Sequence, residues 1–157
     1  MRDSIIHGYL EIHGLTESLP ILKTCFEGEI IGMGHHSLWT EKWGANQEAD
    51  RDHWTKLNPA LAIETDLLDK FEPSRTEYAF PSDQYIYMRW KEHFLVPNHK
   101  LTRIEGASFD GFYYIIMDRF TGALEGFYYH ISSEKYQKLD LQPVEDNLRS
   151  FPSYAFQ

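Results

Sequence analysis

The stretch 85-YIYMRWKEHFLVP-97 has the alternation of one long β-strand, and it places a carboxylate on an otherwise apolar face. Successive side chains of a strand point to opposite faces, so every second residue shares one surface. The even positions from Ile86 to Val96 are apolar with the exception of Glu92. The pattern therefore predicts a core strand that carries one unexplained acid.

Strand patterns on both sides of this stretch indicate an antiparallel sheet. Residues 5–15 alternate, and residues 22–32 form a second strand pattern whose glycines predict bends or bulges. Towards the C-terminus, the patterns 109–117 and 124–132 are joined by a short glycine-containing turn, which is a hairpin signal. Each of these two strands carries consecutive tyrosines, so each pair is expected to point one ring inward and one outward.

A different pattern occupies the region from about residue 43 to 80. Residues 45–57 are polar and compatible with a helix, with the acids of 48-EADRDHW-54 expected on its solvated face, and residues 60–71 have an apolar helical face. Residues 132–144 are expected to hold a short helical turn. Several strands with short connections and one helical insertion predict an all-β fold, an antiparallel up-and-down β-barrel forming a single domain over 1–157.

Composition narrows the classes of function. The net charge of -9 argues against nucleic acid and anionic membranes as partners. The single cysteine, Cys25, excludes an internal disulfide and a thiolate metal cluster, and the eight histidines lack metal-ligand spacing, so no metal and no cofactor are predicted. No secretory signal, transit peptide or membrane-span pattern is present, which predicts a cytoplasmic protein, with the nucleus as a second location.

The residues alone leave several interpretations of Glu92 open. It can be a structural acid paired with Arg89, Lys91 or another arginine, or a bulge can turn it outward. Alternatively it is a site prepared for a cation, because an ionised carboxylate in an apolar interior is costly unless it is paired. A lipocalin-like carrier of an apolar ligand would keep Glu92 as a structural acid, and a hydrolase would need a second acid such as Asp110.

Four stretches together resemble a known family. They are 8-GYLEIHGLTESLPILKTCFEGEII-31, 87-YMRWKEHFLVP-97, 106-GASFDGFYYI-115 and 124-LEGFYYHISSEKYQ-137. They are similar to the substrate-receptor subunits of the glucose-induced degradation (GID, also CTLH) ubiquitin ligase, also called the vacuolar import and degradation family. The resemblance covers nearly the whole chain from about Gly8 onward.

The resemblance implies a binding module and not a catalyst. Its fold would be an eight-stranded antiparallel barrel with a helical insertion, and its pocket would hold the N-terminus of a substrate protein, typically one that begins with proline. Glu92 would contact the free amino group, and in the empty protein it would be unpaired or satisfied only by water. The other residues that the resemblance places at the pocket are Tyr113, Ser108, Phe109, Tyr128, Ile12, Leu15, Leu22 and Thr24.

Two departures from the family pattern qualify these expectations. Family members normally have another strand upstream of the one that begins at Gly8, so the barrel is expected to lack that strand here, and its open edge could pair with a second chain as a dimer. The C-terminal residues of the family dock an armadillo-type scaffold subunit. Here that role is expected for Tyr154, Phe156 and Gln157, although Gln157 replaces a basic residue.

Overall fold

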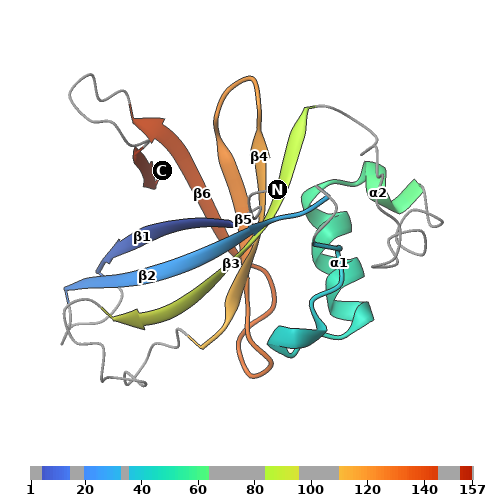
Figure 1. Cartoon of the computed structure of the whole chain (residues 1–157), viewed down its shortest axis with the longest axis horizontal. Coiled ribbons are helices and arrows are strands. Elements are labelled where there is room, and N and C mark those ends of the chain that lie inside the picture. Colours follow the sequence, from blue (N-terminus) through green and yellow to red (C-terminus); the bar gives the residue numbers. More distant parts are fainter. Residues whose placement is uncertain are drawn as a thin grey trace.

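In the part of the chain that the structure describes, seven strands form one antiparallel sheet, in which each strand pairs with the next along the chain. The computed structural model describes residues 5–14, 20–32, 36–63, 84–95, 110–144 and 153–156, without the side chains of 62–63, 94–95 and 153–156. The strands are β1 (Ile5–His13), β2 (Ile21–Ile30), β3 (Tyr85–Leu95), β4 (Phe112–Asp118), β5 (Leu124–Tyr129), β6 (Gln137–Val144) and β7 (Ser153–Phe156). Figure 1 shows that this sheet twists and curls strongly. The predicted all-β, up-and-down barrel architecture with a helical insertion is confirmed.

Helices occupy the segment between β2 and β3 and lie together on one side of the sheet (Figure 1). They are η1 (Glu41–Trp43), α1 (Gln47–Leu57) and α2 (Ala60–Ile63). Asn46 caps α1, because its side-chain oxygen accepts a hydrogen bond from the backbone N–H of Ala49 at 2.8 Å. The rest of the second predicted helix lies outside the described residues. Within the described part of the chain, no helix is long and apolar enough to cross a membrane.

Strand β6 corrects the prediction of a helical turn over residues 132–144. The chain from Gln137 to Val144 pairs with β5 on one side and β7 on the other. Leu139 and Leu141 are buried while their neighbours are more exposed, so the burial repeats every two residues, as it does in a strand. In the described residues β1 and β7 are the two edges of the sheet. Pairing of the β1 edge with another chain stays a prediction.

At β4 both faces of the sheet are buried, which explains the nearly continuous apolar run of this strand. One face carries the inner cluster, and the other face packs against the helices in the outer cluster. Tyr113 and Tyr128 belong to the inner face, whereas their neighbours Tyr114 and Tyr129 lie on the helix side, so the predicted alternation of the tyrosine pairs is confirmed. The inner cluster comprises Leu10, Phe26, Met88, Trp90, Tyr113, Ile115, Leu124, Tyr128, Leu139 and Leu141. The outer cluster comprises Ile31, Leu38, Ala45, Trp54, Leu61, Tyr87, Phe112, Tyr114 and Ile116.

Glycines make room for the large rings of the inner cluster. A Cβ atom at Gly8 would lie 2.5 Å from the ring of Phe26, and one at Gly28 would lie 2.8 Å from the indole of Trp90. The two rings stack on each other, with their centroids 4.4 Å apart. Small and large residues therefore alternate across neighbouring strands, and the aromatic side chains fill the concave side of the sheet.

A buried polar network fastens the helical insertion to the outer face. Arg89 donates to the carboxylate of Glu29 at 3.0 Å and to the hydroxyl of Thr40 at 2.9 Å. Asp50 accepts the backbone N–H of Thr40 and the hydroxyl of Tyr114, both at 2.8 Å. Asp50 is fully buried, so the expectation that the acids of this helix face solvent is wrong for this residue. Its partners lie 10 and 64 residues away in the sequence and satisfy the carboxylate on the inside of the helix.

Candidate functional site

Glu92 lies near the end of β3 and faces the inner cluster. Trp90, two residues earlier on the same face, stacks on Phe26, and Phe26 is the cross-strand partner of Glu92. The carboxylate is 4% exposed. The unusual acid of the sequence pattern is therefore enclosed by aromatic side chains and is not turned outward.

A β-bulge lies beside Glu92. Phe26 of β2 pairs with Glu92, but the preceding residue, Cys25, pairs with Phe94, so His93 is the extra residue on β3. The predicted even-face alternation, which was continued to Val96, is therefore interrupted after Glu92. A bulge bends its strand and redirects the neighbouring side chains, and such bulges often lie next to functional sites.

Thr24 gives Glu92 a hydrogen-bond partner, so the expectation that this acid is unpaired or satisfied only by water in the empty protein is wrong. The Thr24 hydroxyl donates to Oε1 of Glu92 at 2.6 Å, and Thr24 is fully buried. Arg89, one of the predicted ionic partners, lies on the opposite face and pairs with Glu29. Among the described residues, no cation forms an ion pair with Glu92. A neutral hydroxyl satisfies part of the carboxylate without balancing its charge.

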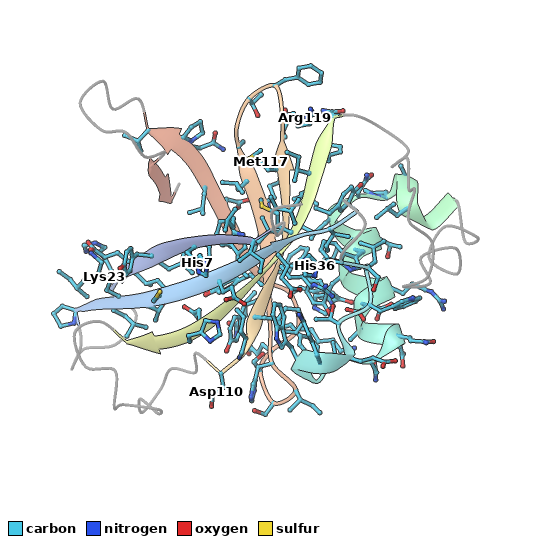
Figure 2. All side chains as sticks on the ribbon, viewed as in Figure 1. His7, Lys23, His36, Asp110, Met117 and Arg119 are labelled. Atoms are coloured by element: carbon cyan, nitrogen blue, oxygen red, sulfur yellow. The ribbon has the colours of Figure 1, made fainter. Side chains whose placement is uncertain are left out.

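Burial raises the pKa of Glu92 to about 7, although the hydrogen bond from Thr24 and the nearby charge of Lys91 lower it. No other carboxyl among the described residues contributes to this shift. The hydrolase interpretation required a second acid such as Asp110; Asp110 lies beyond the end of β4 away from Met117 (Figure 2), which is the end near Glu92, but it is exposed and its charge is not among the causes of the Glu92 pKa shift. The described site therefore offers one buried carboxylate that is available for an incoming cation.

Two phenols complete the described part of the site. Tyr113 lies on β4 opposite Trp90, and its ring packs against Tyr128 of β5 with the centroids 5.2 Å apart. Burial, followed by the charge of Glu92, raises the pKa of Tyr113 well above its ordinary value. The phenol thus stays neutral and keeps its proton, so it can donate a hydrogen bond or accept one beside the carboxylate.

The structure brings together four of the predicted pocket residues: Glu92, Thr24, Tyr113 and Tyr128. Leu22 is buried two residues before Thr24 on the same face of β2, and it pairs with the half-buried Ile12 on β1. Leu15, Ser108, Phe109 and Gln157 lie outside the described residues, and the side chains of Tyr154 and Phe156 are not described. Their predicted roles remain predictions.

Sequence reasoning missed two side chains that form the wall of the site. Trp90 is 5% exposed, and its indole N–H has no hydrogen-bond partner among the described residues. Phe26 stacks on it from the neighbouring strand. The signal for Trp90 was present, because it shares the even face with Glu92. The position of Phe26 depends on the register between β2 and β3, which no local pattern predicts.

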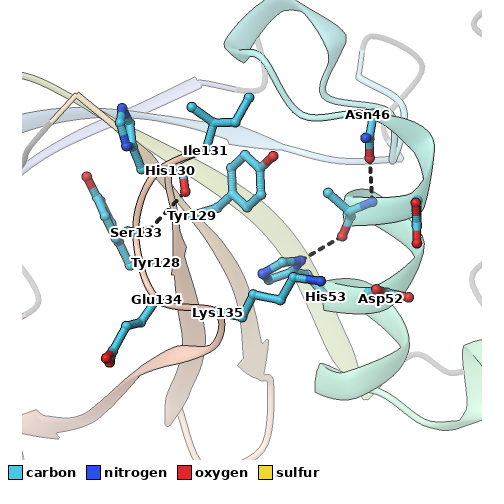
Figure 3. A pocket seen from close by; sticks show the side chains of 12 residues that line it. Asn46, Asp52, His53, Tyr128, Tyr129, His130, Ile131, Ser133, Glu134 and Lys135 are labelled. Atoms are coloured by element: carbon cyan, nitrogen blue, oxygen red, sulfur yellow. Dashed lines mark hydrogen bonds between the residues drawn. The ribbon is translucent and has the colours of Figure 1, made fainter.

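A hollow with a volume of about 200 Å³ lies away from Glu92, between α1 and the turn from β5 to β6 (Figure 3). The ring of His53 lines it, donates from Nδ1 to the carbonyl of Ala49 at 2.6 Å, and stacks on Tyr114. Burial lowers the pKa of His53, so the ring is neutral at physiological pH. Of the acids at this hollow, Glu48 and Glu134 are exposed and Asp52 is half-buried. Water can therefore solvate them, and the hollow lacks the desolvated charge that distinguishes the site around Glu92.

Comparisons with known proteins show which family the chain resembles. A family model described as "Vacuolar import and degradation protein" matches residues 1–144. The "Glucose-induced degradation protein 4 homolog" of Mus musculus is 45% identical over 98% of this chain and 68% of that protein. The "GID complex substrate-recognition subunit 4" of Schizosaccharomyces pombe is 34% identical over 100% of this chain and 82% of that protein.

A further relative is the "GID complex substrate-recognition subunit 10" of Saccharomyces cerevisiae, which is 33% identical over 96% of this chain and 59% of that protein. The matches extend over almost all of this chain, including the strands that carry Glu92, Thr24, Tyr113 and Tyr128. The resemblance inferred from four sequence stretches is thereby confirmed. The chain belongs to the vacuolar import and degradation protein family.

Proposed function

We propose that this chain is a substrate-recognition subunit of a GID-type ubiquitin ligase, and that it binds proteins through a free N-terminal residue, with proline as the preferred one. The names of the relatives support the first part of the proposal. The chemistry of the site supports the second. In this role the chain is not an enzyme: it holds the substrate while other subunits of the ligase transfer ubiquitin.

The observation that carries the proposal is the buried carboxylate of Glu92, whose hydrogen-bond partner in the described structure is the neutral hydroxyl of Thr24. Burying an acid with a pKa of about 7 destabilises the folded protein, because the charged form loses its hydration. A ligand that brings a cation balances the charge of Glu92 and offsets this loss of stability, and it forms a charge-assisted hydrogen bond with the carboxylate. An N-terminal ammonium group is such a cation, and it is small enough to reach a buried acid.

The walls of the site favour an N-terminal residue with a small apolar side chain. Trp90, Phe26, Tyr113 and Tyr128 present apolar ring surface around Glu92, and Leu22 adds aliphatic surface on the side of β2. Apolar area removed from water contributes about 25 cal/mol per Å². An N-terminal proline has a compact ring and two N–H donors on one charged nitrogen. We therefore assign the ammonium to Glu92 and the ring to the surrounding aromatic side chains.

The proposed partners follow from the same role. The N-terminal peptide of a substrate protein occupies the site around Glu92, and an armadillo-type scaffold subunit of the ligase binds the C-terminal segment that includes β7. The described strand β7 pairs with β6 over Ser153–Phe156, which places Tyr154 and Phe156 at an edge of the sheet. An edge strand is accessible to a partner chain, and this supports docking at that place.

The experiment that tests this function compares two peptides which differ in their N-terminus alone. One begins with a free proline, and its twin carries an N-terminal acetyl group. Acetylation of the proline nitrogen removes its charge and both N–H donors, so it should weaken binding by about 2–5 kcal/mol, or at least about 30-fold in Kd. Equal affinities for the two peptides would refute the proposed function. A small apolar ligand that raises the Tm while neither peptide binds would instead favour a carrier.

A further inference from the structure

The strand end next to the site contains a contact that the proposed function does not explain. Lys91 follows Trp90 on β3, and its ammonium group donates hydrogen bonds to the backbone carbonyls of Asp110 and Gly111, the second at 2.9 Å. The ladder between β3 and β4 ends with the pair Lys91 and Phe112. The two carbonyls lie just beyond that ladder, and Lys91 provides the donors that a continuing strand would have provided.

Gly111 is held on three sides. Its carbonyl accepts from Lys91, its N–H donates to the hydroxyl of Tyr128 at 3.0 Å, and its α-carbon lies against the ring of Tyr128. A Cβ atom at this position would lie 2.5 Å from the Cζ atom of that ring. The position of Gly111 therefore determines where the phenol of Tyr128 can lie.

This contact leads back to the carboxylate. The ring of Tyr128 packs on that of Tyr113, and the charge of Glu92 contributes to the raised pKa of Tyr113. Building on the function proposed above, we propose that Lys91 is a positioning residue for the N-terminal amine: it holds Gly111, and through Gly111 it holds the Tyr128 phenol against Tyr113 at the wall of the site. Lys91 does not itself touch the ligand, because adjacent residues of a strand point to opposite faces.

Lys91 also acts on Glu92 through its charge. Among the described residues, the groups that face Glu92 are Thr24 from β2, Tyr113 from β4 and, behind Tyr113, Tyr128 from β5. Of these, none is a cation. Lys91 is half-buried and lowers the pKa of Glu92, so it favours the charged form that binds an ammonium. Removing the lysine charge should therefore shift the pH dependence of binding, which loss of packing alone would not do.

The test uses a set of matched variants and a peptide with a free N-terminal proline. Lys91→Met keeps the aliphatic length and loses the charge and the donors, whereas Lys91→Arg keeps both. Lys138→Met is the control, because it removes the same charge from an exposed lysine of β6 whose carboxylate partners are Glu125 and Asp140. We expect Lys91→Met to weaken binding about tenfold, the order of one charge-assisted hydrogen bond. We also expect the pH midpoint of binding of Lys91→Met to move to higher pH. Lys91→Arg should keep most of the affinity for the peptide, and Lys138→Met should have the same Kd and pH midpoint as the unmodified protein.

A measurement without ligand separates this proposal from the proposed function. The amide of Gly111 should exchange with solvent faster in Lys91→Met than in the unmodified protein, because the contact that holds it to Tyr128 loosens. If the unmodified protein does not bind the peptide but this exchange rate rises, the proposed function fails and the positioning contact stands. If Lys91→Met has an unchanged Kd, binding midpoint and Gly111 exchange rate, the positioning role is wrong.

Discussion

Replacing Glu92 by glutamine should make the empty protein more stable at alkaline pH while it removes binding. The folded protein holds this acid with a pKa of about 7, above the ordinary value of 4.5, because burial disfavours the charge. A raised folded pKa means that the folded state binds the proton more tightly than the unfolded state does. Stability is therefore lost as the pH rises from 4.5 to 7, and the loss above pH 7 is about 3 kcal/mol, at 1.36 kcal/mol per tenfold change.

Glutamine can keep the hydrogen bond from Thr24, because its side-chain oxygen accepts in the place of Oε1. It has no charge to desolvate, so the pH-dependent part of the penalty disappears. The stability difference between Glu92→Gln and the unmodified protein should therefore grow by about 2–3 kcal/mol between about pH 5 and about pH 8. Taking this difference cancels the contribution of all other titrating groups, including His53.

Urea unfolding of both proteins at the two pH values measures this quantity, provided that the m-values agree. Thr55→Val is a useful control, because it removes a hydroxyl from an exposed part of α1 and should show no pH-dependent difference. A stability difference between Glu92→Gln and the unmodified protein that is constant with pH would refute the reasoning. It would mean that the carboxylate of Glu92 is either solvated or already neutralised in the folded state.

Three further predictions concern the same site and its support. Binding of a peptide with a free N-terminal amine should weaken about tenfold per pH unit below pH 7, because Glu92 becomes protonated. Isothermal titration calorimetry over a pH series would measure this change in Kd, and a Kd that does not vary with pH would contradict the prediction. Thr24→Val should lower stability at alkaline pH by about 1.5–3 kcal/mol, as expected for a lost hydrogen bond to a charged group, and should raise the pH midpoint of binding. Arg89→Met should lower the free energy of unfolding, measured in urea, by about 3–5 kcal/mol, because it leaves the buried Glu29 without this partner. It should leave the peptide Kd of the folded protein unchanged, because Arg89 lies on the opposite face of the sheet from Glu92. A large change in Kd would show that the two faces are coupled.

The strands β1 to β5 and the unusual position of Glu92 could be predicted from the sequence because both depend on local alternation, whereas β6 was predicted as a helical turn. Side chains of a strand alternate between its two faces, and this period of two residues is sufficient to assign the even positions of β3 to one face. It also assigns the two members of each tyrosine pair in β4 and β5 to opposite faces. The bulge opposite Cys25 and Phe26 could not be predicted in the same way. It depends on the register between two strands that are separated by more than fifty residues.

The partners of the buried acids were missed for a related reason. Glu92 receives its hydrogen bond from Thr24, which is 68 residues away, and Asp50 receives one from Tyr114, which is 64 residues away. A charged residue in a polar helix pattern is usually solvated, so the pattern of α1 predicted exposure for Asp50. The folded chain instead encloses this acid between the helix and the sheet, where Thr40 and Tyr114 satisfy it.

The most direct test of the central claim, that Glu92 binds the free amine of a substrate N-terminus, is a cycle of four affinities. The unmodified protein and Glu92→Gln are each titrated with a proline-initiated peptide and with its N-acetylated twin. The account predicts that acetylation costs about 2–5 kcal/mol in the unmodified protein and little in Glu92→Gln, so the two changes are strongly coupled. If acetylation costs the same in both proteins, the amine and Glu92 do not interact, and the assignment of the site is wrong.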